Sequence, residues 1–268
     1  MTWLFTDGLE RLLRLIQAAL QVIQAYPLAF SLFISALSFI SPQIITTDGK
    51  ESSSIDPAAL AVILTGVRTQ MGTWRRVIRL FRFIESFAAA QTLYVSTSLS
   101  LGTWLSIFSH SFNGMYLLLE AVTLLDVLGI PGLSLWGAEY GSILKIESQR
   151  SWLFALVSGA LAGLLQFSKL RADRAAALKN QENPKEKKGS DSKASADKTA
   201  AAVKAIDAQI MATGRKVTAN ILDLVLPGSV IGWIPATSGT VGSAMLLTSL
   251  LTGYDVWLRC GKEVGNTK

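Results

Sequence analysis

The segment Trp74–Phe87, with the sequence WRRVIRLFRFIESF, decides how this chain can fold. At about 100° per residue, four basic side chains fall in one narrow sector of a helix: Arg68, Arg75, Arg79 and Arg82. The opposite side is aromatic and aliphatic, and comprises Trp74, Val77, Leu80, Phe81, Phe83, Ile84 and Phe87. Such a pattern predicts an amphipathic helix at the boundary of an anionic membrane, with arginines toward the headgroups and rings toward the acyl chains. The alternative is a surface helix that buries its apolar face against its own protein.

Composition favours the membrane interpretation. Half of the 268 residues are hydrophobic and only 16% are charged, whereas soluble domains carry about 25% charged residues. The net charge of +6 lies in residues 169–216, which hold 12 basic and 6 acidic residues; the rest of the chain has 13 of each sign. Because no base-stacking aromatics accompany these charges, we expect no nucleic-acid partner.

The N-terminal part reads as a series of helices. A first amphipathic helix is predicted over about 7–25, beginning near Asp7 with Glu10 as its capping-box partner. A short apolar helix should follow over 28–40, and then a polar loop over 41–55. Asp56 followed by Pro57 is typical of a helix N-terminus. The second amphipathic helix is therefore predicted over about 57–87.

Two acidic residues, Glu120 and Asp126, interrupt the apolar run YLLLEAVTLLDVL of residues 116–128. Acidic groups inside hydrophobic segments are costly and often functional. Six positions apart, they do not share a helix face. We expect each instead to cap a helix end or to pair with an arginine of the basic segment.

Two segments further on are candidates for crossing the bilayer. Residues 151–168 carry no charge, and 31 uncharged residues lie between Asp223 and Asp255; a spanning helix needs about 20. The polar stretch 169–216 between them is predicted to be a charged flexible linker. The expected organisation is a helical membrane-associated region over 1–168, the linker over 169–216, and a Gly-rich hydrophobic membrane segment with a short tail over 217–268. The expected fold class is all-α, a membrane-associated helical bundle with one or two membrane helices, whose orientation stays open.

Small residues recur in both hydrophobic segments. Glycines at a spacing of four let helix backbones approach closely, within one molecule or between copies. The glycines predicted to serve helix packing or oligomerisation are Gly159, Gly163, Gly228, Gly232, Gly239 and Gly242. The alternative for the C-terminal glycines is simple loop flexibility.

Catalytic patterns are almost absent. His110 is the sole histidine, Cys260 is the sole cysteine, and there is no nucleophile elbow, P-loop or dinucleotide fingerprint. We therefore predict no enzyme activity, no catalytic residue, no metal site and no cofactor.

The order of these segments resembles the peroxin-11 family of peroxisomal membrane proliferation factors. The resemblance rests on ERLLRLIQ at 10–17, WRRVIRLFRFIESF, LLLEAVTLLDVLGI at 117–130, SQRSWLFAL at 148–156 and the closing LPGSVIGWIPATSGTVGSAMLLTSLLTGYDVW at 226–257. It covers most of the chain except 41–55 and 169–215, and the long charged stretch is similar to that of fungal members.

The resemblance implies a peroxisomal membrane protein that elongates the membrane before fission, self-associates into homo-oligomers, and works with fission adaptors and a dynamin-like GTPase. The membrane-binding residues would be Arg68, Trp74, Arg75, Arg76, Val77, Arg79, Leu80, Phe81, Arg82, Ile84 and Phe87, acting on anionic lipids. One alternative is a pore or carrier for small metabolites, lined by Ser96, Thr97, Ser98, Ser100 and Thr103. The other is a passive adaptor that only recruits the fission machinery.

Overall fold

The computed structural model describes residues 2–40, 56–96, 100–130, 132–182 and 192–266, and every regular element in these ranges is a helix. This confirms the expected all-α class. The elements are α1 (Thr2–Ala25), α2 (Pro27–Ile40), α3 (Pro57–Ile78), α4 (Arg82–Ser96), α5 (Leu101–Val122), α6 (Leu124–Leu128), α7 (Gly137–Glu182), α8 (Ser192–Asp223), α9 (Val225–Ile231) and α10 (Ser238–Asn266). The polar loop predicted over 41–55 lies outside the described residues.

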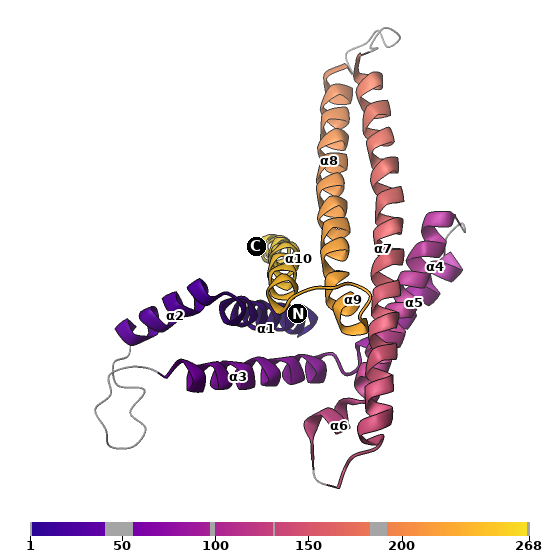
Figure 1. The fold of residues 1–268 in the computed structure, drawn as a ribbon. Coiled ribbons are helices and arrows are strands. Elements are labelled where there is room, and N and C mark those ends of the chain that lie inside the picture. Colours follow the sequence, from indigo (N-terminus) through magenta and orange to yellow (C-terminus); the bar gives the residue numbers. More distant parts are fainter. Residues whose placement is uncertain (1, 41–55, 97–99, 131, 183–191, 267–268) are drawn as a thin grey trace.

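Two long helices give the molecule its longest dimension. α7 and α8 pack side by side as a hairpin that extends well beyond the other elements, and α5 packs along the lower half of α7 with α4 on its other side (Figure 1). α9 fills the position where α8 ends, against α7. These elements form one half of the structure.

The other half is built around α1, which packs against α10, α3 and α2 (Figure 1). α2 is bent from α1 by 109° at Tyr26. α10 also packs against α8, so that it joins the two halves. α1 therefore connects α3, which belongs to the arginine-rich part of the chain, to α10 near the C-terminus.

Local sequence signals set several helix ends. As predicted, Asp56 caps α3: its carboxylate accepts a hydrogen bond of 3.0 Å from the Ala58 N–H, and Pro57 occupies the first helical position. Gly129 and Gly232 end α6 and α9 in the left-handed region, with φ of 63° and 85°. The predicted start of the first helix near Asp7 is wrong, because α1 already begins at Thr2.

The structure combines an apolar core with several buried polar groups and many exposed apolar side chains. Buried polar residues include Glu10, Arg14, Glu120, Asp223 and Thr248. Large apolar side chains are exposed along most helices, among them Leu28, Phe39, Val62, Trp74, Phe81, Leu161, Leu250 and Trp257. Large apolar side chains exposed in such number fit a lipid environment better than water.

Among the described residues, two helices are long and apolar enough to cross a membrane, within Gly137–Lys179 of α7 and Ser238–Gly261 of α10. They contain the predicted candidates at 151–168 and in the closing segment. The bent pair α1 and α2 would make a third only if the two were one broken span.

The predicted single helix over about 57–87 is divided in the structure. α3 ends at Ile78, residues 79–81 form a turn, and α4 begins at Arg82. At the turn the Arg79 N–H is shared between the carbonyls of Arg75 and Arg76. The break lets α4 pack on α5, where the Phe87 ring lies against Gly114.

The stretch 169–216, predicted to be a flexible linker, is helical wherever the structure describes it. α7 continues to Glu182 and α8 starts at Ser192. Leu170 and Thr213 are buried within the hairpin. Alanine, lysine and arginine have high helix propensity, and two such helices side by side bury enough surface to hold each other.

Candidate functional site

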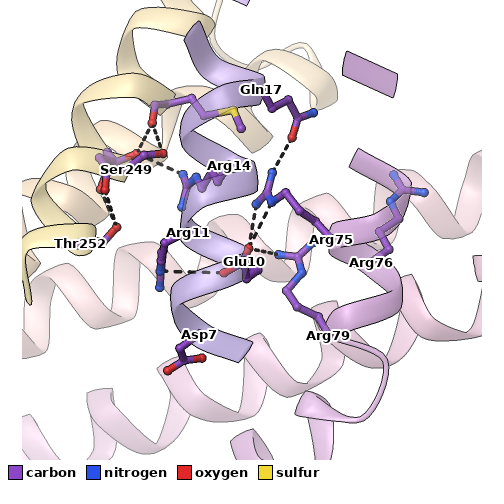
Figure 2. A network of polar contacts seen from close by, with 12 residues as sticks. Asp7, Glu10, Arg11, Arg14, Gln17, Arg75, Arg76, Arg79, Ser249 and Thr252 are labelled. Atoms are coloured by element: carbon purple, nitrogen blue, oxygen red, sulfur yellow. Dashed lines mark hydrogen bonds and ion pairs between the residues drawn. The ribbon is translucent and has the colours of Figure 1, made fainter. Parts of the chain in front are cut away.

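The arginines of the sequence motif point into the protein, where carboxylates meet them. Arg75 binds Glu10 of α1 through Nη2 at 3.0 Å and Nε at 3.2 Å, and its Nη1 donates to the Gln17 Oε1 at 2.7 Å. Figure 2 shows Glu10 between the side chains of Arg75, Arg79 and Arg11. These contacts fix α3 against α1.

A second carboxylate lies at the turn between α3 and α4. Glu120 of α5 accepts from the Arg79 Nη2 at 2.8 and 3.0 Å, from the Tyr116 hydroxyl at 3.3 Å, and lies 3.4 Å from the Arg76 Nε. The Arg79 guanidinium also stands 5.8 Å from the centre of the Tyr116 ring. The predicted pairing of Glu120 with an arginine of the basic segment is confirmed.

A third pair was not singled out from the sequence. Arg14 of α1 binds Asp223 at the end of α8 and donates to the Thr248 Oγ1 of α10 at 3.1 Å. Arg14 and Asp223 are almost fully buried. The only available signal was that Arg14 lies on the polar side of the first amphipathic helix. We call Glu10, Arg14, Arg75, Arg76, Arg79, Glu120 and Asp223 the arginine–carboxylate cluster.

Burial and neighbouring charges shift the pKa values of Arg75 and Arg79. Burial, and then the neighbouring charge of Arg79, lower the pKa of Arg75 from 12.5 to about 10. Burial acts to lower the pKa of Arg79 as well, but the Glu120 carboxylate outweighs it and raises that pKa above its ordinary value. Both guanidiniums are therefore charged at neutral pH.

Only part of the apolar side of the motif faces outward. Trp74, Phe81 and Ile84 are 61%, 68% and 56% exposed, while Val77, Leu80 and Phe87 are half-buried. Arg82 lies 3.2 Å from Asp7 through its Nη1. Arg68 is half-buried and pairs with no carboxylate among the described residues. Membrane binding by this set stays a prediction, with the arginine sector turned toward the protein and with Trp74, Phe81 and Ile84 turned away from it.

The predicted packing glycines make close contacts within the chain. A Cβ on Gly159 would lie 2.8 Å from the Ser109 Oγ of α5, and one on Gly163 would lie 2.5 Å from Val217 of α8. Gly228 lies against Ile234, whereas Gly232 provides the left-handed end of α9. Of the glycines in α10, Gly239 lies against Tyr26 at the bend between α1 and α2, and Gly242 lies against Gln21 of α1. Their use between copies stays a prediction.

Asp126 acts as a local cap, which was the other possibility named for it. Its carboxylate accepts from the Ser134 hydroxyl at 2.7 Å and from the N–H groups of Leu135 and Trp136 at 2.9 and 3.3 Å. These bonds tie α6 to the start of α7. Asp126 is thus part of the framework rather than of the cluster.

The residues proposed to line a pore are only partly described. Ser100 caps α5, where its Oγ accepts from the Thr103 N–H at 3.2 Å. Thr97, Ser98 and the side chain of Ser96 lie outside the part of the chain that the structure describes. Elsewhere, no group of three His, Cys, Asp or Glu among the described residues could hold a metal ion.

A comparison with known protein families identifies the family of this chain. The family model for peroxisomal biogenesis factor 11 matches residues 50–257, which include α3 to α9 and most of α10. This chain belongs to the peroxisomal biogenesis factor 11 family. It is therefore a peroxisomal membrane protein with a role in peroxisome biogenesis and proliferation, and its family is not one of known enzymes. No curated protein and no solved structure matches the chain.

Proposed function

We propose that this chain elongates the peroxisomal membrane ahead of fission, by inserting the exposed apolar side of α3 and α4 into one leaflet and by self-association. The observation that carries the proposal is the outward position of Trp74, Phe81 and Ile84. Carboxylates on α1 and α5 hold the arginines of the same segment on the inner side.

Shallow insertion is a physical rather than a chemical mechanism. Each large side chain contributes about 1.5–3 kcal/mol at full burial and less at an interface. Rings that enter only one leaflet expand it and favour positive curvature. Since Glu10 and Glu120 neutralise much of the arginine charge, the apolar residues carry most of the membrane affinity, and salt should weaken it only modestly.

Several copies inserted into the same leaflet would together bend the membrane more than one copy can. The glycine faces of α7 and α10 are occupied by α5, α8 and α1, which leaves exposed apolar residues such as Leu161, Leu164 and Leu250 for contacts between copies. Fission adaptors and a dynamin-like GTPase are the partners that would act on the elongated membrane.

The test uses the full chain reconstituted into anionic vesicles and viewed by electron microscopy. The variant Trp74→Ser with Phe81→Ser should lose tubulation while it keeps its helical circular dichroism. Met211→Ser on α8 is the matched control, because Met211 is 68% exposed like Phe81 but lies on the polar hairpin. Tubulation that persists in the double variant would contradict the proposal.

Two further outcomes point to the alternatives. Vesicles that keep their shape with the wild-type chain, together with lost peroxisome elongation in cells lacking it, would indicate a passive adaptor. Metabolite flux through wild-type vesicles that persists in the non-tubulating variant would indicate a separate pore.

A further inference from the structure

A cavity of about 630 Å³ lies at the arginine–carboxylate cluster. Its walls come from α1, α3, α4, α5, α7, α8, α9 and α10. Sites for small molecules in proteins have volumes of about 300–1,000 Å³. The cavity is therefore large enough for a small polar molecule or for the headgroup of a lipid.

The lining carries an excess of positive charge. The arginines that line it are Arg11, Arg14, Arg75, Arg76, Arg79 and Arg82. The carboxylates that line it are Glu10, Glu85, Glu120 and Asp223. Two positive charges are thus left over, and one remains even when Asp7, which pairs with Arg82 at the edge, is counted.

The carboxylates are shared among too many arginines to satisfy them all. Glu10 alone lies within 4 Å of four guanidiniums, at 3.0 Å from Arg75 and at 3.9 Å from Arg11, Arg79 and Arg82. Glu120 is shared between Arg76 and Arg79. Since a buried cation without a matching anion is costly, this arrangement favours an additional negative charge in the cavity.

Hydrogen-bond donors are left over as well. Among the described residues, the Nε atoms of Arg14 and Arg79 are buried and have no acceptor. The approach of Arg11 to Glu10, at 3.9 Å, is beyond hydrogen-bond distance. Gln149 and Asn220 line the cavity. Buried donors in native proteins normally have an acceptor, so these unpaired groups are a further sign that the guanidiniums are crowded, although the two Nε atoms themselves are closed off from the cavity.

We propose that this cavity binds a phosphate-bearing anion. Several guanidiniums gathered around one cavity match the charge of a phosphate and its preference for arginine, and Gln149 and Asn220 supply neutral amide contacts. Arg82 and Glu85, whose side chains are 31% and 49% exposed, mark the edge through which the ligand enters. The phosphate belongs either to a lipid headgroup or to a soluble phosphate ester. The site stands independently of membrane elongation.

The test measures ligand binding to the full-length protein in detergent by calorimetry. The probes are glycerol 3-phosphate and dihexanoyl phosphatidic acid, with glycerol and dihexanoyl glycerol as uncharged counterparts. Both phosphate probes should bind and the uncharged ones should not. Arg11→Gln and Gln149→Glu, which change one charge each at the wall, should each weaken phosphate binding about tenfold, equivalent to about 1.4 kcal/mol.

Matched controls carry the same changes away from the cavity. Arg171→Gln and Gln209→Glu lie at exposed positions of the hairpin and should bind within about twofold of the wild type, well short of the tenfold that 1.4 kcal/mol represents. The proposal is overturned if the folded wild type binds neither phosphate probe. It is equally overturned if Arg11→Gln and Gln149→Glu bind as these controls do.

The two phosphate probes distinguish the sources. Binding of the phosphatidic acid at least about tenfold tighter than glycerol 3-phosphate supports the site and identifies a lipid headgroup with its chains. Equal affinity supports the site and identifies a soluble phosphate ester.

Discussion

Of the arginine–aspartate pairs that join α8 to another helix, two lie in very different surroundings. Arg14 of α1 meets Asp223 at the base of α8, where the side chains are 6% and 10% exposed. Arg174 of α7 meets Asp207 in the outer arm of the hairpin, where they are 44% and 45% exposed. The buried pair determines which helices meet, because either charge left alone there would be costly. Water can solvate both charges of the exposed pair, so this pair only adds to a hairpin that helix packing already holds.

Removing one partner of the buried pair should have the largest effect. Arg14→Met leaves Asp223 buried and unpaired, so the free energy of unfolding should fall by about 3–5 kcal/mol. The measurement is unfolding of the purified protein in detergent, followed by circular dichroism. Adding Asp223→Leu should restore most of the loss, because no buried charge then remains. A double variant as unstable as Arg14→Met alone would show that the pair is not what joins α1 to α8.

The contact between α7 and α8 can also be tested at a glycine, where a substitution changes the packing but no charge. Gly163→Ala would place a Cβ 2.5 Å from the Val217 Cγ2, and such overpacking should cost about 1–3 kcal/mol. Val217→Ala in the same chain should recover part of it. Gly141→Ala on α7 is the matched control: nothing lies within 4 Å of that Cβ, and the change should stabilise the helix by about 0.5–1 kcal/mol. Equal effects at both positions would contradict a close α7–α8 contact at Gly163.

The exposed pair should give a much smaller effect. A double-mutant cycle of Arg174→Ala and Asp207→Ala should yield a coupling energy of about 0.2–1 kcal/mol, and 0.5 M salt should reduce it. The cycle is measured on the same unfolding transition as the buried pair. A coupling energy as large as that of Arg14 and Asp223 would remove the contrast between the two regions.

The smallest expected effect is local and depends on pH. The hydrogen bond from Ser134, followed by the N–H groups of Trp136 and Leu135, lowers the pKa of Asp126 below 3.8. A carboxyl group with a lowered pKa stabilises the folded state above its unfolded pKa, and this contribution is lost as the pH falls through the folded pKa. Hydrogen exchange of residues 133–136 should therefore speed up below about pH 4, once the change in intrinsic exchange rate is subtracted. Asp126→Ala, which has no side-chain acceptor, should exchange quickly at every pH, and a pH response identical to that of the wild type in this variant would exclude the cap.

The sequence predicted helices more reliably than it predicted their partners. Asp56 and Pro57 start α3 as expected because capping is a local interaction. The break at residues 79–81 was missed, since the periodicity of the motif continues through it. The helices of 169–216 were missed because each helix of the hairpin alone buries too little surface to be stable. Only their packing against each other makes both stable.

The candidate site could be predicted only in part, because it too depends on contacts between segments that are distant in the sequence. The motif at 74–87 showed that arginines and aromatic residues lie on opposite sides, and Glu120 was expected to meet an arginine. Glu10 and Asp223 were not expected in the cluster, because they lie 65 and 209 residues from the arginines they bind.

The sequence by itself determined the helical class, the two membrane-length segments, the opposition of basic and aromatic faces, and the family. Each of these depends on residues that are neighbours along the chain or repeat at helical spacing. The tertiary structure alone decided that the arginines face inward, that the aromatic face is left on the surface, and that six arginines gather around one cavity. Those features depend on which distant carboxylates reach the arginines, and that is fixed only when α1, α5 and α8 pack together.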